Sequence, residues 1–581
     1  MKVINPSAFL TRLSGEKAVP QWRQGLLNIL ILAALTAALL VPRVIGLGRF
    51  VTPDEPLWGK RSGSFYYAIQ NREFAGTYQT GHPGVMAMWA GALAYQRVFP
   101  EFKEYGQIEL GDAKVLEIFQ RHGINPMEIL TTARLNMILF ATIALLLSFH
   151  FARRMFGLLP AAVTLLVIAF DPFQVAHTRV LHHFGLLSCL TFLAVLAYLD
   201  FLRSHSRVSL IISAAAGGLS ILTVAPGIVL IPVIGLLSLS GLYDAEKKKL
   251  VLNWKRLWRN TLSPALIWGS LAFLTVFAAW PSMWVDSLGT MQRVAAYALS
   301  AGEGEIGGTH FVESFQAGPD DGTLYLHYYP LTYLWRSTPA TLFGLVLFVA
   351  VLLRERRSNR IQREVKLVLL GLMVFVLAYL TLMSIGEKKF DRYLLPVYPP
   401  LSLLATLGWI WASETASHRL QFKKVLPAAI LSLVFIVQIV SSVRTAPYYL
   451  TYFNPLFGGL EKAPQVLMVG WGEGLNEAAL YLKDDPDIRK KRIISWYPLA
   501  FNWYSFNLGF QAEHAEFSWD NTPETYQDFD YAVLYINQIQ RNIPPALMNV
   551  LLPLEPEHSV SIDGVEFVRI YRLNNPTASE N

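Results

Sequence analysis

The chain has 581 residues, of which 53% are hydrophobic and 16% charged, with a formal net charge of +7. Soluble domains carry about 25% charged residues, so this composition excludes an ordinary soluble protein and indicates a membrane protein. The basic residues lie mainly between apolar segments, which argues against a nucleic-acid-binding face as the reason for the positive charge. Cys189 is the single cysteine, so an intramolecular disulfide is excluded.

Long apolar runs predict a polytopic α-helical membrane protein with about eleven transmembrane helices. The segment from Met1 to Arg23 is basic, and the apolar run after it is too long for a removable signal peptide, so we expect an uncleaved first span. The predicted spans are 24–47, 131–152, 158–172, 184–202, 208–224, 226–242, 262–284, 332–353, 365–384, 394–412 and 424–443.

Lysine and arginine predict the orientation of these spans. Every second loop is basic, and cytoplasmic loops are usually the ones enriched in these residues. The basic loops lie at 153–154, 203–207, 247–259, 354–366 and 419–424. The N-terminus is therefore predicted to be cytoplasmic, and the long loops 48–130 and 285–331 extracytoplasmic.

We expect the chain to fold into two structural parts. Residues 1–443 form a membrane module whose first extracytoplasmic loop is 48–130. Residues 444–581 form a C-terminal extracytoplasmic α/β domain, because "YAVLYINQ" and "VEFVRIYRL" alternate like strands and "GLNEAALYLKDD" is typical of a helix.

The first loop opens on two adjacent carboxylates, Asp54 and Glu55, directly after the first span. Further along, Pro83 predicts the start of a helix with His82 at its N-terminal edge. Trp89 and its neighbours form an amphipathic stretch that is suited to lie on the membrane surface. The simpler interpretation is a solvated acidic pair and an interfacial helix.

A second cluster, Lys388, Lys389 and Arg392, is predicted to lie on the outer side, against the usual charge bias. Cations at the headgroup level suit a phosphate, since arginine can bind two phosphate oxygens at once. The alternative is ion pairing with Glu387 and Asp391 alone.

Further polar and aromatic residues are expected at the same outer face. Arg179, His182 and His183 follow one span, and Trp284, His327, Tyr328 and Tyr329 border the loop 285–331. Aromatic residues at an interface are often simple anchors, but next to carboxylates and cations they are also suited to line a sugar site. No zinc-binding spacing is evident, although His82 or His327 could join a carboxylate around a divalent metal. The stretch "GWGEGLNEAALYL" lacks the spacing of a dinucleotide fingerprint.

Four motifs, taken together and in order, resemble a known family. "TPDEP", "GHPGVMAMW", "HTRVLH" and "EKKFDRYLLPVYPPL" resemble GT-C fold glycosyltransferases, nearest to bacterial relatives of the protein O-mannosyltransferases and the lipid A aminoarabinose transferases. The resemblance implies a bacterial plasma-membrane enzyme. It would transfer a sugar, with inversion, from a polyprenyl-phosphate donor to a protein, lipid or glycan acceptor on the extracytoplasmic face.

The resemblance also implies roles for individual residues. Asp54 matches the catalytic base and Glu55 its partner. Arg392, with Lys388 or Lys389, matches the basic patch that meets the lipid phosphate, and Arg179 is counted with it.

Two positions depart from the family pattern. Phe184 stands where relatives often carry an acid, and Val224 where relatives tend to have a lysine. These departures keep an inactive envelope scaffold open as an alternative. A lipid or small-molecule transporter or flippase is the other, although neither repeated halves nor broken helices are clear in the sequence.

Overall fold

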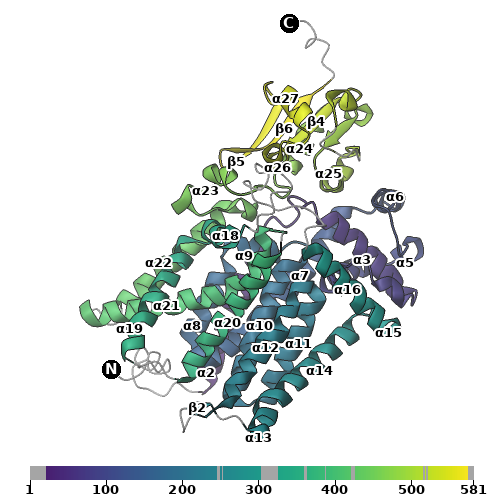
Figure 1. The fold of residues 1–581 in the computed structure, drawn as a ribbon. Coiled ribbons are helices and arrows are strands. Elements are labelled where there is room, and N and C mark those ends of the chain that lie inside the picture. Colours follow the sequence, from purple (N-terminus) through teal and green to yellow (C-terminus); the bar gives the residue numbers. More distant parts are fainter. Residues whose placement is uncertain are drawn as a thin grey trace.

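Helices dominate the computed structural model, and a small sheet lies near the C-terminal end (Figure 1). The structure describes residues 21–244, 249–250, 253–302, 325–358, 363–386, 388–420, 425–513, 517 and 521–573. Most of the basic N-terminal segment, part of the loop 285–331, parts of the basic loops at 247–259, 354–366 and 419–424, and Glu387 lie outside these described residues.

Eight described helical segments are long and apolar enough to cross a membrane, or up to ten if each of two bent helix pairs counts as one span. The polytopic helical architecture predicted from the sequence is therefore confirmed. The predicted span 208–224 coincides with α11, which has 17 residues and is shorter than the ~20 that a straight span needs. The count of eleven transmembrane helices therefore stays a prediction. The eight segments lie in α2 (Gln21–Val44), α7 (Pro126–Phe156), α10 (His183–Ser204), the stretch Ala225–Leu242 around α12 (Leu230–Ser238), α13 with α14 (Trp254–Leu257, Ser263–Ala279), α20 (Arg363–Ile385), the stretch Asp391–Ser417 with most of α21 (Tyr398–Leu420), and α22 (Val425–Thr445).

The helices differ in how much of their apolar surface is covered by protein. In α10, 89% of the apolar window is buried, whereas in α2 only 17% is buried and Ile29 and Leu30 are exposed. An exposed apolar face on a spanning helix is a lipid-facing face, since lipid tails satisfy the same side chains that a core would. Helix α10 therefore forms the centre of the bundle and α2 lies at its edge.

Two spans are broken near one end of the bundle. Helix α8 (Leu158–Ala169) meets α9 (Pro172–Thr178) at 69°, and α18 (Tyr328–Arg336) meets α19 (Pro339–Ser358) at 118°. Each break precedes a proline, which cannot donate to the preceding helical turn. Asp171 caps α9 by accepting a hydrogen bond of 2.9 Å from the main-chain N–H of Gln174. Because of these breaks, α9 and α18 are short helices. They lie at the end of the bundle that carries the sheet, and we call this end of the bundle the domain end.

The first loop folds against the bundle. Its helices are α3 (Glu55–Gln70), α4 (Val85–Val98), α5 (Phe102–Tyr105) and α6 (Asp112–His122). The expected helix after Pro83 is α4, but the expectation that it lies on the membrane surface is wrong. Val85, Ala87 and Met88 are fully buried, and Trp89 Nε1 donates a hydrogen bond of 2.8 Å to the carbonyl of Ala279. Both faces of α4 carry apolar residues, so it packs between α3 and α7.

The C-terminal part contains the predicted strands and helix. β4 (Tyr531–Tyr535) and β6 (Val565–Arg572) cover the two alternating stretches, and α24 (Leu475–Leu482) covers the predicted helix. The sheet order is β3-β4-β6-β5, with β3 (Ile493–Ser495) parallel to β4 and the other pairs antiparallel. The remaining described elements are β1 (Tyr243–Asp244), β2 (Lys249–Leu250), α15 (Ser282–Val285), α16 (Ser287–Gly302), α23 (Gly459–Lys462), α25 (Pro498–Ser505), α26 (Ile536–Arg541), α27 (Pro545–Leu551) and β5 (His558–Ile562).

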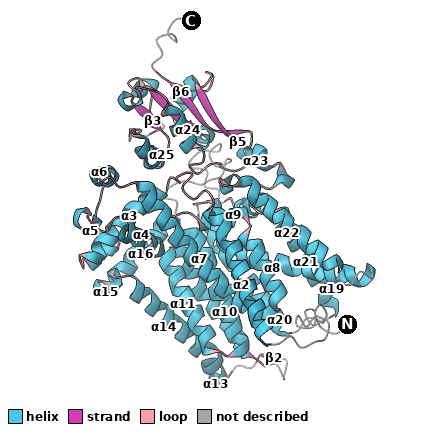
Figure 2. Ribbon diagram, turned by 180° about the vertical axis from the view of Figure 1, so that it is seen from behind, coloured by secondary structure: helices cyan, strands magenta, loops and turns pink. Residues whose placement is uncertain are grey.

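The sheet and the first loop meet at the domain end, opposite β2 and α13 (Figure 2). A Cβ on Gly59 of α3 would lie 2.3 Å from the ring of Trp503 in α25, so only glycine permits this approach. Trp503 also contacts the ring of Phe119, and Arg49 pairs with Glu477 at 2.7 Å. These contacts hold the C-terminal part over the beginning of the first loop, next to the two predicted carboxylates.

Candidate functional site

Asp54 lies where three distant segments meet. It is the N-cap residue of α3, and its side chain is 31% exposed. Its Oδ2 lies 3.4 Å from Nε2 of His182, which precedes α10, and 3.5 Å from Nη2 of Arg392, which precedes α21. The structure thus brings together one predicted carboxylate, one predicted cation and one predicted histidine.

Glu55 is placed quite differently from its neighbour. It is fully buried and forms an ion pair with Arg134 of α7, whose Nε donates to Oε1 at 2.7 Å. The main-chain N–H groups of Thr52 and Leu181 donate to the same carboxylate at 2.9 and 2.8 Å. Burial raises the pKa of Glu55, but the Arg134 charge and these hydrogen bonds outweigh it and hold the pKa below 4.5. The carboxylate is therefore ionised and joins the first loop to α7 and to the segment before α10.

The predicted phosphate-binding cations also separate into two groups. Arg392 and Lys388 share the ring of Phe390, with Arg392 Cζ 4.1 Å and Lys388 Nζ 5.4 Å from its centroid. Lys388 is half-buried, and burial next to Arg392 lowers its pKa. Arg392 contacts the Asp54 carboxylate, and the charge of Asp54 also acts on Lys388.

Lys389 and Arg179 instead bind main-chain carbonyls. Lys389 is buried and donates to Ser384 O at 2.7 Å, at the end of α20. Arg179 donates to Ile45 O at 2.7 Å and lies over the ring of Tyr449. Cations at the C-terminal end of a helix stabilise its last carbonyls, which explains Lys389 without a ligand. The phosphate-binding roles predicted for these two residues do not fit their placement.

Three of the four predicted histidines, His82, His182 and His183, form a cluster beside Asp54. The ring of His183 lies 4.0 Å from that of His182 and 5.7 Å from that of His82. Burial, with the nearby charges of Lys388 and Arg61, lowers the pKa of His82 to about 3, and burial also lowers the pKa of His182. Both imidazoles are therefore neutral near pH 7. Among the residues that the structure describes, no group of three His, Cys, Asp or Glu side chains is arranged to hold a metal ion.

The other predicted lining residues differ in exposure. Trp284 is 47% exposed, donates to Phe277 O at 2.6 Å and contacts the ring of Phe74. Tyr328 and Tyr329 are fully buried in α18, whereas His327, the N-cap residue of that helix, is exposed. Trp284 thus has the placement of an interface anchor, which was the simpler interpretation of the aromatic residues.

The two departures from the family pattern are apolar positions inside the fold. Phe184 is buried and its ring lies 4.6 Å from that of Tyr393, the residue after Arg392. Val224 is buried at the end of α11, next to Thr223, whose carbonyl accepts a hydrogen bond from the N–H of Gly84. Both side chains therefore fill the packing around the Asp54 site.

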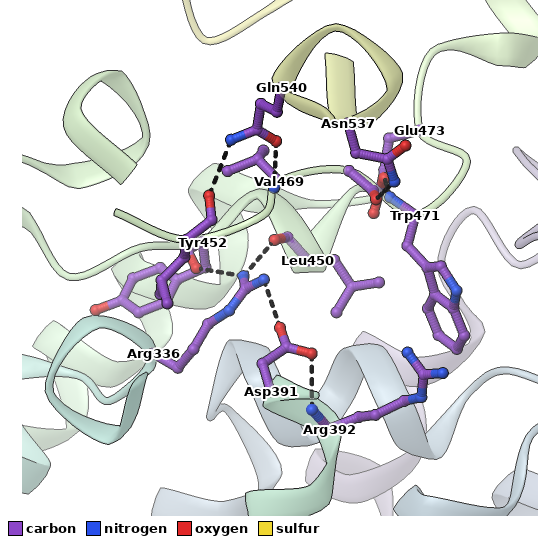
Figure 3. A network of polar contacts seen from close by, with 12 residues as sticks. Arg336, Asp391, Arg392, Leu450, Tyr452, Val469, Trp471, Glu473, Asn537 and Gln540 are labelled. Carbon is purple, nitrogen blue, oxygen red and sulfur yellow. Dashed lines mark hydrogen bonds and ion pairs between the residues drawn. The ribbon is translucent and has the colours of Figure 1, made fainter. Parts of the chain in front are cut away.

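One residue at the site was missed. Trp471, in the "GWGEG" loop, lies over Arg392 with its ring centroid 5.1 Å from Cζ, and its ring also contacts His182 and His177 (Figure 3). A signal was available, because the glycines at 470, 472 and 474 alternate and all have positive φ. At Gly472 a Cβ would lie 2.2 Å from the carbonyl oxygen of Val51, so the loop can approach the start of the first loop only with glycine.

Comparison with known proteins gives likenesses in structure only. No protein-family model and no curated protein matches the sequence. The structure is similar to that of ArnT from Cupriavidus metallidurans bound to undecaprenyl phosphate, with a TM-score of 0.49 and 14% identity over 95% of this chain and 98% of that chain. It is also similar to that of the archaeal oligosaccharyltransferase AglB from Archaeoglobus fulgidus in complex with an inhibitory peptide and a dolichol-phosphate. Here the TM-score is 0.48 and the identity 11%, over 96% of this chain and 75% of that chain.

Both of these proteins have the GT-C fold, the fold class that the sequence motifs predicted. Identities this low, with TM-scores below 0.5, say nothing of a shared reaction. A proposal for the reaction must therefore depend on this chain's own residues.

Proposed function

We propose that the protein is an integral-membrane, inverting glycosyltransferase. It moves a sugar from a polyprenyl-phosphate donor to a protein, lipid or glycan acceptor on the extracytoplasmic face of a bacterial plasma membrane. The observation that carries the proposal is the meeting of Asp54 Oδ2 and Arg392 Nη2 at 3.5 Å. A carboxylate that can take a proton and a guanidinium that can bind a phosphate lie side by side at the domain end of a membrane-spanning bundle.

Asp54 supplies the base in this proposal. An acceptor hydroxyl is a weak nucleophile, and a positioned carboxylate takes its proton as the oxygen attacks the anomeric carbon. The new glycosidic bond forms while the bond from that carbon to the phosphate oxygen breaks, and the electron pair leaves with the phosphate. His182 is neutral, so an N–H at Nε2, which faces Oδ2 at 3.4 Å, holds the carboxylate in position without taking the proton itself.

Arg392 and Lys388 stabilise the leaving group. The polyprenyl phosphate gains negative charge as it departs, and fixed cations bind that charge more strongly in the transition state than in the ground state. The Arg392 guanidinium contacts the rings of both Phe390 and Trp471, at 4.1 and 5.1 Å from their centroids, so it is already oriented when the donor arrives. The polyprenyl tail would remain in the lipid beside the bundle.

The test measures sugar transfer from donor to acceptor by the full-length protein in nanodiscs. Radiolabelled polyprenyl-phosphate sugars are mixed with a crude envelope fraction as acceptor, and we expect label to move to the acceptor. Donor that binds but is never transferred would support the inactive scaffold. Labelled lipid that crosses the bilayer without any transfer would support the flippase.

Removal of the Arg392 guanidinium should weaken donor binding. Hydrogen bonds to charged groups contribute roughly 1.5–3 kcal/mol, so Arg392→Ala should raise the donor dissociation constant about 10- to 100-fold. Arg97→Ala is the matched control, because Arg97 is exposed in the last turn of α4. Titration of undecaprenyl phosphate measures both variants, and unchanged affinity in Arg392→Ala would contradict the phosphate-binding role.

Trp471 should act through Arg392. A cation–π contact contributes roughly 0.5–2 kcal/mol, so we expect Trp471→Ala to weaken donor binding about 2- to 30-fold. Trp471→Phe keeps a ring over the guanidinium and should recover most of the affinity. Equal losses in the two variants would show that the indole, not the stacking on Arg392, is what matters.

A further inference from the structure

A cavity lies on the side of Arg392 that faces the C-terminal part of the chain. Its floor is formed by His177 of α9, Arg336 at the end of α18, Asp391 and Arg392. The segment that carries Met468 and Trp471 also lines it, and Figure 3 shows Trp471 above Arg392. The empty space is about 350 Å³, a figure that includes open solvent, so this is an open pocket and not a closed void.

Both carboxylate oxygens of Asp391 already accept hydrogen bonds within this cavity. Its Oδ2 accepts a hydrogen bond of 2.7 Å from Nη2 of Arg336, and its Oδ1 accepts one of 2.7 Å from the main-chain N–H of Arg392. Nη1 of Arg336 donates to the carbonyls of Leu450 and Tyr452 at 2.6 and 3.1 Å. The carboxylate and the two Nη atoms are thus matched to each other and to the main chain.

Several polar atoms of these lining residues remain unmatched. The Nε atoms of Arg336 and Arg392 and both ring nitrogens of His177 are buried without a hydrogen-bond partner among the described residues. Arg336 and His177 are themselves only 4% and 2% exposed. A buried donor without an acceptor is destabilising, so three such side chains around one cavity call for an acceptor-rich ligand.

The charges indicate the same ligand class. Among the lining residues two guanidinium groups face one carboxylate, and Arg392 also pairs with Asp54, which does not line the cavity. A neutral imidazole adds one N–H donor. We infer that this cavity is a second oxyanion-binding site, for a phosphate- or carboxylate-sized group, lined by Arg392 but not by Asp54.

This site goes beyond the proposed function. The cavity is present whether or not the protein transfers sugars. Only the distinction between this site and the donor-phosphate site rests on the proposed function. Asp54 and Lys388 are not among the described residues that line it. A lipid phosphate at Lys388 and a second oxyanion at His177 would therefore share one guanidinium, that of Arg392.

Calorimetric titration of the full-length protein in nanodiscs tests the inference, with inorganic phosphate and undecaprenyl phosphate as separate probes. His177→Phe removes the ring nitrogens but keeps a ring against Phe173, and we expect phosphate affinity to fall at least fivefold. His150→Phe is the matched control, since His150 is exposed on α7. Met468→Trp should fill the cavity and reduce phosphate binding at least tenfold, which keeps the test valid if His177→Phe fails to fold.

The two probes separate the two sources of phosphate. We expect both cavity variants to bind undecaprenyl phosphate normally, and Lys388→Ala to show the reverse pattern. An equal loss for both probes in the cavity variants would mean that the cavity holds the lipid headgroup and is no second site. Unchanged phosphate affinity in both cavity variants would overturn the inference, whether or not the protein transfers sugars.

Discussion

Asp54→Asn should reduce sugar transfer by about 10²- to 10⁴-fold, the range by which a positioned general base accelerates a reaction. Asparagine has nearly the same shape as aspartate, so the contacts with His182 Nε2 and Arg392 Nη2 keep their geometry. It cannot accept the acceptor's proton at pH 7, so the chemical step loses its base. The rate is measured as radiolabel transferred from the polyprenyl-phosphate donor per unit time under single-turnover conditions.

Donor binding should respond in the opposite direction. The Asp54 carboxylate lies 3.5 Å from Arg392 and competes with an incoming phosphate for that guanidinium. Neutralising it should leave donor affinity unchanged or make it tighter, since like charges near one site repel each other. A variant that binds donor tightly and does not transfer the sugar is the signature of a lost base.

The matched control is Asp112→Asn. Asp112 also lies in the first loop and pairs with Lys60 at 2.9 Å, with 27% of its side chain exposed. The same chemical change there should leave transfer within about twofold of the parent protein, because exposed ion pairs contribute little. Transfer by Asp54→Asn at the parent rate would exclude Asp54 as the base. Loss of donor binding in that variant would instead assign Asp54 to holding Arg392.

Sequence reasoning placed Asp54 and Arg392 on the same face because charge bias reports the orientation of each span. The two residues are far apart in the sequence, yet the alternation of basic loops predicted that both lie at one end of the bundle. The structure brings them within 3.5 Å. Membrane topology reduces a three-dimensional question to a choice between two ends, and this explains the accuracy of that part of the prediction.

The same reasoning could not tell which of two adjacent, like-charged residues faces the site. Asp54 and Glu55 are both acidic, as Lys388 and Lys389 are both basic, and composition cannot tell which of each pair faces the site. Asp54 is the N-cap residue, whereas Glu55 is the first residue of α3 and is directed at Arg134. That distinction depends on the exact start of the helix and on a partner in α7, which hydrophobic periodicity does not resolve.

Trp471 could not be identified as a site residue from the sequence for a different reason. Its contact with Arg392 requires the C-terminal part to dock on the bundle, and that docking depends on side chains from several elements, among them Trp503 on Gly59. The alternating glycines indicated a tight loop but not its neighbour. Long-range packing of this kind has no short sequence pattern, so the residue could be found only from the structure.

Glu55→Gln should destabilise the protein far more than its single-atom change suggests. Glutamine leaves Arg134 charged and without a carboxylate in a site where both side chains are at most 2% exposed. Removing one partner of a buried ion pair costs about 3–5 kcal/mol, because the remaining charge has lost its compensation. We expect a clear fall in the midpoint temperature of unfolding, measured for the full-length protein in detergent at pH 7.

Glu477→Gln is the matched control for this change. Its pair with Arg49 also joins two distant segments at 2.7 Å, but the two side chains are 34% and 50% exposed. An exposed pair contributes roughly 0–1 kcal/mol, so the midpoint temperature should hardly move. The contrast tests burial, because the chemical substitution is the same in both variants.

The pH dependence provides an independent check on the sign of the effect. The pKa of Glu55 in the folded protein is held below its ordinary value of 4.5, so its ionised form stabilises the fold above about that pH. This contribution is lost as the pH falls through the folded-state pKa. The difference in stability between the parent protein and Glu55→Gln should therefore be largest near pH 7 and shrink below about pH 4.5. A variant with normal stability at pH 7 and no transfer activity would contradict this structural role and return Glu55 to the chemistry beside Asp54.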